Sequence, residues 1–311
     1  KDNGWSSYPL DNTSFKKLKI KKPDYIYVSH LHCDHFDEKT LLKLKKKKQK
    51  IIIKNFKNKI LKKKLILLEF KKIIELDAWK NYKINNDFNL AIIPQITSNS
   101  SEKSEQISFD LDTSIVLQCS KSKKIFYNNV DNPVSLKDLT KLKKFVIKKF
   151  KQPISMTCFG VGASSEYPQC FLNINRKKEQ KKIIEHSLKK LKKTLDIIKP
   201  KIYFPAGGTY NIYGKFSKLN KFIAQPNFNQ INQMNQKNIL FENLIGGGTI
   251  KINNKDNIKV IKPNSKIINH RNQIYLKKLE TKKYFYEKRK IVDKEKLSNL
   301  FEIAKKNFVT F

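Results

Sequence analysis

Three histidines and an aspartate crowd into six consecutive positions near the start of the sequence, His30-Leu31-His32-Cys33-Asp34-His35. The pattern is HxHxDH, and it holds three of the five histidines in the whole chain. Neutral imidazole and carboxylate groups are good ligands for zinc, iron and manganese. A cluster of solvent-exposed histidines in a polar loop is the alternative. The close spacing favours a metal site instead.

The flanking residues predict a rigid support for these side chains. Residues 24–29 are β-branched and aromatic in character and predict a short strand. Asp37 and Glu38 form an acidic first turn before an amphipathic helix. The metal motif is therefore expected on a turn that leaves the end of a buried strand, where side chains can converge on one point.

Strands and helices alternate along most of the remaining sequence, which predicts a layered α/β fold. A β-hairpin is predicted at residues 114–118 and 124–127, which are separated by a polar turn. The clearest amphipathic helix spans residues 176–199. Further predicted elements are strands at residues 51–53, 65–68, 90–94, 153–159 and 201–205, a helix at 136–151 and a loop at 225–238.

A metal site needs ligands from more than one element, and Asp131 is the best further candidate. It ends the second strand of the predicted hairpin. An aspartate that caps a turn before Pro133 is an equally open interpretation of the same residue.

Small residues in segment 160–171 could let backbone N–H groups approach an anion. Gly162 and Ser164 are the candidates of this kind, and Tyr167 and Tyr210 could contact or stack on a substrate. A tight turn between a strand and a helix is the alternative for this segment. These four residues are the candidate substrate-binding set.

The chain is strongly basic, with a formal net charge of +39 over 311 residues. Of its 66 basic residues, 63 are lysine and only Arg176, Arg271 and Arg289 are arginine. Specific nucleic-acid readout usually uses arginine, so a general compositional bias is favoured over a dedicated nucleic-acid surface. The positive potential would attract an anionic small-molecule substrate. The protein would bind nucleic acid only non-specifically.

The four cysteines lie far apart and form no CxxC pair, which favours a reducing, cytoplasmic location over a disulfide framework. No stretch approaches the ~20 apolar residues that span a bilayer. The sequence does not begin with methionine, so an incomplete N-terminus is expected. The charged, helical character of the last part of the chain predicts an appendage.

HxHxDH after a hydrophobic strand resembles the metal motif of the metallo-β-lactamase superfamily. The resemblance implies an αββα sandwich in residues 1–250, with residues 251–311 as a C-terminal strand and helical appendage. It assigns His30 and His32 to a first metal, Asp34 and His35 to a second, and Asp131 to a bridge between the two. One or two divalent ions are expected, zinc in the first place and iron as the alternative. Asp34 would also orient the attacking water as a base.

The order of several short segments along the chain makes the resemblance more specific within the superfamily. Gly4-Trp5, Asp112-Thr113, Val130-Asp131, Gly162-Ala163-Ser164 and Pro200–Tyr203 occur in an order similar to that in the metallo-β-lactamase-like part of the CMP-N-acetylneuraminate hydroxylases and their bacterial relatives. Those hydroxylases also carry a Rieske iron–sulfur domain. The present sequence has no CxxH partner for such a cluster. The Rieske part would therefore lie on a preceding portion of the protein or on a separate electron-donor protein, or the reaction would need no electrons.

The sequence departs from the superfamily in its later histidines. No histidine lies between residues 36 and 185, and His186 and His270 are not placed like the missing ligands. A single metal, or two metals completed by other ligands and water, is therefore expected. The sequence predicts a metal-dependent hydrolase of an anionic ester, amide or sugar nucleotide. The alternatives are a sugar-nucleotide hydroxylase component, a non-catalytic module that binds nucleotide sugars or nucleic acid, and a nuclease.

Overall fold

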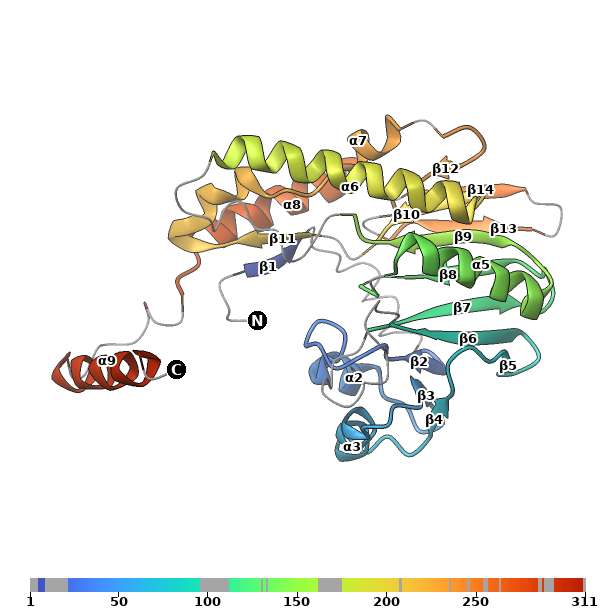
Figure 1. Cartoon of the computed structure of the whole chain (residues 1–311), viewed down its shortest axis with the longest axis horizontal. Helices are drawn as coiled ribbons and strands as arrows, with labels where there is room; N and C mark the ends of the chain where they lie inside the picture. Colours follow the sequence, from blue (N-terminus) through green and yellow to red (C-terminus); the bar gives the residue numbers. More distant parts are fainter. Residues whose placement is uncertain are drawn as a thin grey trace.

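The computed structural model describes residues 5–8, 22–95, 112–129, 131–132, 134–161, 175–206, 209–234, 236–244, 247–253, 257–262, 264–284, 287 and 294–309. Two larger β-sheets face each other, and helices cover their outer faces (Figure 1). The layers run helix, sheet, sheet, helix. This arrangement confirms the predicted mixed α/β fold with αββα layers.

The first sheet carries the metal motif. Its three parallel strands lie in the order β2-β3-β4 and span Tyr25–Tyr27, Lys50–Lys54 and Ile73–Leu76. Helices α2 (Glu38–Leu44) and α3 (Ile60–Leu67) pack on its outer face through a cluster that includes Leu41, Ile51, Ile53, Leu61 and Leu65. The Asp37 side chain accepts a 2.7 Å hydrogen bond from the backbone N–H of Thr40 and so caps α2. The cap fixes where the motif turn ends.

The second sheet has seven strands in the order β12-β10-β9-β8-β7-β6-β5. In chain order, β5 to β10 span Tyr82–Lys83, Phe88–Pro94, Thr113–Cys119, Ile125–Asn128, Ile154–Phe159 and Ile202–Pro205, and β12 spans Leu240–Phe241. Strands β8, β9, β10 and β12 are parallel, whereas β5 to β8 pair antiparallel. Ligands of open α/β sheets bind beyond the carboxyl ends of parallel strands. Asp131 follows β8 at this edge.

Helices α5 (Leu136–Phe150) and α6 (Arg176–Ile198) cover the outer face of the second sheet (Figure 1). The larger cluster beneath them includes Val116, Tyr127, Leu142, Val146 and Ile198. A neighbouring cluster joins α6 and the short helix α7 (Phe228–Asn232) to β9, β10 and β12. These helices are amphipathic, and burial of their apolar stripes holds them to the sheet.

The two sheets meet through a shared apolar layer. Ile52 and Leu76 from the first sheet and Leu90 and Ile92 from the second are buried there. Tyr27, at the end of β2, packs against this cluster. The end of β2 therefore lies against the second sheet, which brings the HxHxDH turn toward it.

Smaller elements complete the described chain. Strands β1 (Trp5–Tyr8) and β11 (Thr209–Ile212) pair, as do β13 (Thr249–Ile252) and β14 (Ile258–Ile261). The 3-10 helix η2 (Gly214–Phe222) contacts α8 (Ser265–Glu280), and α9 spans Lys294–Val309. The Tyr284 hydroxyl donates a 2.6 Å hydrogen bond to the carbonyl of Tyr213. In the described ranges, every helix is too short or too polar to cross a membrane.

Two local predictions were wrong. Leu65–Leu68, predicted as a strand, belongs mostly to α3, and the next strand is β4. Leu61 and Leu65 lie four residues apart on the buried side of this helix, while Leu67 is 80% exposed. The segment 225–238, predicted as a loop, contains α7, which begins with a capping box between Asn227 and Gln230. The predicted hairpin and the helices near residues 136–151 and 176–199 are confirmed.

Candidate metal centre

The HxHxDH residues form a tight turn beyond the carboxyl end of β2. The backbone N–H groups of His35 and Phe36 both donate to the carbonyl of His32, at 2.9 and 2.7 Å. The turn gathers the three imidazoles, with ring centroids 4.5 Å apart for His30 and His32 and 4.3 Å apart for His30 and His35. His30 is buried at 1% exposure, whereas the His32 side chain is 51% exposed. One ring thus anchors the turn and another faces solvent.

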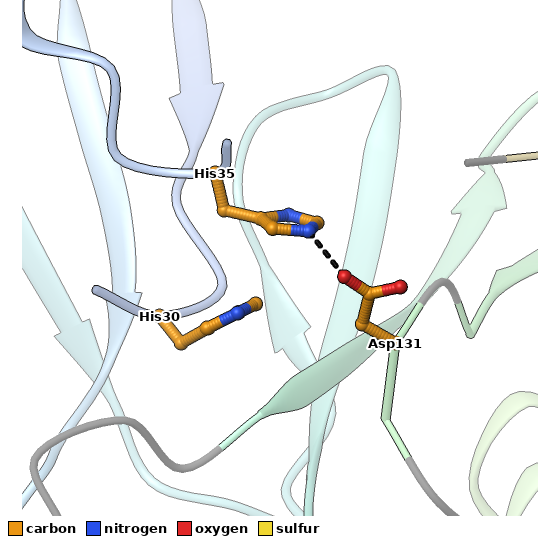
Figure 2. A group of neighbouring side chains, drawn as sticks. All are labelled: His30, His35 and Asp131. Atoms are coloured by element: carbon orange, nitrogen blue, oxygen red, sulfur yellow. Dashed lines mark hydrogen bonds and ion pairs between the residues drawn. The ribbon is translucent and has the colours of Figure 1, made fainter. Parts of the chain in front are cut away.

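Asp131 reaches this turn from the second sheet. Its Oδ2 atom lies 2.5 Å from His35 Nε2, and Figure 2 shows the carboxylate facing the His35 ring with the His30 ring nearby. The backbone of Asp131 has a φ of 68°, a left-handed conformation that aspartate adopts more readily than most residues. A residue held in this conformation beside a histidine cluster is typical of a functional position.

His35 and Asp131 shift each other's proton affinity. Burial opposes the charged form of His35, but the hydrogen bond to Asp131 and the charges of Asp131, Asp34 and Asp112 outweigh it and raise the pKa of His35. The hydrogen bond to His35 lowers the pKa of Asp131 despite partial burial. The pair therefore favours an imidazolium facing a carboxylate when no cation other than a proton lies between them.

Asp112 is a further acidic residue of the cluster, and the sequence analysis did not identify it as a ligand. Its Oδ1 atom lies 3.0 Å from His30 Nε2 and 3.9 Å from His32 Nδ1. This oxygen is buried, yet it makes no hydrogen bond with any residue that the structure describes. A buried carboxylate oxygen without a hydrogen bond is costly, and a cation bound between it and the two imidazoles would remove that cost.

The position of Asp112 follows from the β7–β8 hairpin. Ile115 pairs with Asn128 in this hairpin. Continuing the same register beyond the paired residues brings Asp112 and Asp131 to the same end of the two strands. This register is the sequence signal that could have identified Asp112, because the hairpin and Asp131 were both predicted.

The donor atoms fit a divalent ion. His30, His32 and Asp112 form one group and His30, His35 and Asp131 another, and within each group the ligand atoms lie within 4.8 Å of one another. His30 Nε2 also lies 2.7 Å from His32 Nδ1. Imidazole nitrogens and carboxylate oxygens at such separations can share one ion after small side-chain rotations.

The other candidate residues are placed differently. Asp34 is 56% exposed, with Oδ2 3.8 Å from His35 Nε2, and belongs to neither group. Tyr210 lies in β11 opposite Ser7 of β1, in a sheet separate from the two larger ones. Gly162, Ser164 and Tyr167 lie outside the described residues. His186 is exposed on α6 and His270 on α8.

No family model matches the sequence, and no curated protein matches it either. Among solved structures, the chain is similar to CmlA, a diiron β-hydroxylase from Streptomyces venezuelae, with 11% identity, a TM-score of 0.45 and coverage of 78% of this chain and 46% of that one. The chain thus spans less than half the length of that hydroxylase.

Two further solved structures are similar over most of their length. A protein described as a metal-dependent hydrolase from Parabacteroides distasonis has 17% identity, a TM-score of 0.40 and coverage of 71% of this chain and 76% of that one. The metallo-β-lactamase fold protein YhfI from Bacillus subtilis has 10% identity, a TM-score of 0.40 and coverage of 74% and 78%.

The arrangement of the sheets and helices agrees with the resemblance described for the sequence. Two facing sheets lie between outer helices, and the HxHxDH turn lies beyond the end of β2 with Asp131 beyond the end of β8. The chain has the αββα layers that this resemblance implies.

Proposed function

We propose that this protein is a metal-dependent hydrolase that acts on an anionic ester, amide or sugar nucleotide. The observation that carries the proposal is the buried Asp112 oxygen without a hydrogen bond, aimed at His30 and His32. Two imidazoles and one carboxylate form a ligand set of zinc hydrolases, which keep one coordination position open. The overall positive charge supports an anionic substrate.

The shared His30 limits how the two groups can be filled. One imidazole nitrogen binds one ion, so His30 Nε2 serves a single group. We assign His30, His32 and Asp112 to the first ion, because the buried oxygen lies in that group. A second ion would then have His35 and Asp131 as ligands, with Asp34 as the nearest further carboxylate, 3.8 Å from His35 Nε2.

The residues around the site have separate tasks in hydrolysis. A divalent ion held by His30, His32 and Asp112 would supply an acidified water and a positive charge that polarises the substrate oxygen. The exposed Asp34 carboxylate can accept a proton at the solvent side of the turn, which is the role of a general base. Asp131 and Asp112 hold their neighbouring imidazoles from the second sheet, while solvent-exposed His32 lies on the side open to substrate.

Metal content is the experiment that tests the proposal. Elemental mass spectrometry of the native protein is expected to find one or two equivalents of zinc, and a His32→Ala/Asp34→Ala variant is expected to lose metal. The zinc-loaded protein should then cleave a chromogenic phosphodiester or carboxylic ester, and the variant should not. Native protein that neither contains nor takes up metal would overturn the proposal and favour a non-catalytic binding module.

A hydroxylase is the second candidate, and the composition of the ligand set favours it. Two histidines with one carboxylate form the facial triad of non-haem iron oxygenases. His30, His32 and Asp112 have that composition. Iron in place of zinc in the native protein would support this candidate, together with turnover that depends on a separate Rieske electron donor.

A further inference from the structure

A serine hydroxyl lies directly behind two of the three histidines. Ser29 Oγ lies 2.9 Å from His30 Nδ1 and 3.4 Å from His35 Nδ1. Ser29 is 9% exposed and His30 is 1% exposed, so water has little access to this contact. One buried oxygen thus contacts two imidazoles of the metal motif.

The opposite nitrogens of the same two rings face the carboxylates. His30 Nε2 lies 3.0 Å from Asp112, and His35 Nε2 lies 2.5 Å from Asp131. A neutral imidazole has one protonated and one unprotonated nitrogen, and the partner of one nitrogen decides which form is present. A ring that binds a metal through Nε2 must therefore carry its proton on Nδ1, where Ser29 lies.

The backbone of Ser29 is held from the second sheet. Its carbonyl accepts a 2.8 Å hydrogen bond from the Thr113 hydroxyl, and Thr113 directly follows Asp112. The hydroxyl that contacts the rings and the carboxylate that faces His30 are therefore fixed relative to each other. Ser29 cannot move away from the histidines without breaking a buried hydrogen bond.

We infer that Ser29 is a positioning residue of the metal centre. Its oxygen has two lone pairs and accepts Nδ1–H of both His30 and His35, which holds both rings in the tautomer with Nε2 ready to bind a metal. This inference rests on the proposed metal binding and adds to it a residue that touches neither metal nor substrate.

Zinc affinity tests the role of the hydroxyl. Calorimetric titration of the metal-free protein with Zn²⁺ is expected to give a Kd that rises about 10–100-fold in Ser29→Ala, the effect typical of a lost partner of a ligating histidine. Ser29→Thr keeps a hydroxyl and should restore most of the affinity. Ser155→Ala is the matched control, because Ser155 is 8% exposed and contacts the backbone N–H of Ile125 far from the turn.

The tautomers can be observed in the wild-type protein, which avoids any dependence on the folding of a variant. With ¹⁵N-labelled histidine, NMR of the zinc form should show Nδ1–H on both His30 and His35. Nε2–H on either ring, or an unchanged Kd in Ser29→Ala, would overturn the inference and leave metal binding intact. Absence of zinc binding by the wild-type protein would overturn the proposed function and this inference together.

Discussion

Replacement of Thr113 by valine would remove one hydroxyl from a buried link between the two sheets. Thr113 is 2% exposed, and its Oγ1 donates to the carbonyl of Ser29 at 2.8 Å. The same oxygen lies 2.5 Å from the Tyr27 hydroxyl. Because Thr113 has a single hydroxyl proton and gives it to Ser29, the Tyr27 hydroxyl donates to Thr113. Valine has nearly the same shape, so the change removes the polar contacts and leaves the packing.

The size of the effect follows from the two groups that lose their partner. The Ser29 carbonyl and the Tyr27 hydroxyl would both remain buried without this hydrogen bond, and burial already raises the pKa of Tyr27 well above its ordinary value. Each buried polar group left without a partner costs about 1–3 kcal/mol. We therefore expect Thr113→Val to lower the free energy of unfolding by about 2–6 kcal/mol.

Urea unfolding of the metal-free protein, followed by circular dichroism, measures this change. Tyr27→Phe removes the hydroxyl on the other side of the link, so the double variant should lose less than the sum of the two single variants. A coupling of about 0.5 kcal/mol or more is expected for residues in one hydrogen-bonded network. A loss below about 0.5 kcal/mol for Thr113→Val, as at an ordinary surface position, would refute the reasoning.

Four further predictions concern the metal centre. Asp112→Asn should weaken zinc binding at least about tenfold in a calorimetric titration, while the metal-free protein keeps or gains stability, because a carboxylate with one buried oxygen that makes no hydrogen bond is replaced by a neutral amide. Asp131→Asn should also weaken zinc binding but leave the fold unchanged by circular dichroism, since asparagine tolerates the left-handed backbone at φ 68°. Removal of zinc by a chelator should lower the free energy of unfolding by about 2.7 kcal/mol relative to protein with free zinc at 100 times Kd. The pKa of His35 is raised above 6.5, so its contribution to the stability of the metal-free protein is fully present below pH 6.5 and is lost as the pH rises through the raised value. Urea titrations across this range should show that loss in the wild-type protein and a smaller one in Asp131→Asn.

The parts of the fold that were predictable from the sequence rest on local patterns. Residues close in sequence determine the structure of two such segments, the run that ends at Ser29 and the polar turn between β7 and β8. Asp131 could be selected because it ends a predicted strand. The register of the same hairpin places Asp112 at the strand end opposite Asp131, but its contact with His30 depends on how the two sheets pack, and no local pattern predicts that packing.

The helix that contains Leu65 shows that a local pattern can also predict the wrong element. Four consecutive apolar residues satisfy the composition of a buried strand as well as that of a helix. The choice between strand and helix depends on Leu61, four residues earlier. Leu61 lies with Leu65 on the face that packs against the first sheet. Leu67 is 80% exposed, so the apolar composition of the run did not indicate which of its residues are buried.

The hydrogen bond between His35 and Asp131 joins residues 96 positions apart in the chain. During synthesis the three histidines emerge first, and they lack both carboxylates until the β7–β8 hairpin has formed and joined the second sheet. Contacts of such large sequence separation form late, because the chain must first close a long loop. Under the proposed metal binding, a nascent chain with only the histidine turn would hold metal weakly, and tight retention would begin when the two sheets meet. Metal loading in the cell would then report that the protein has finished folding.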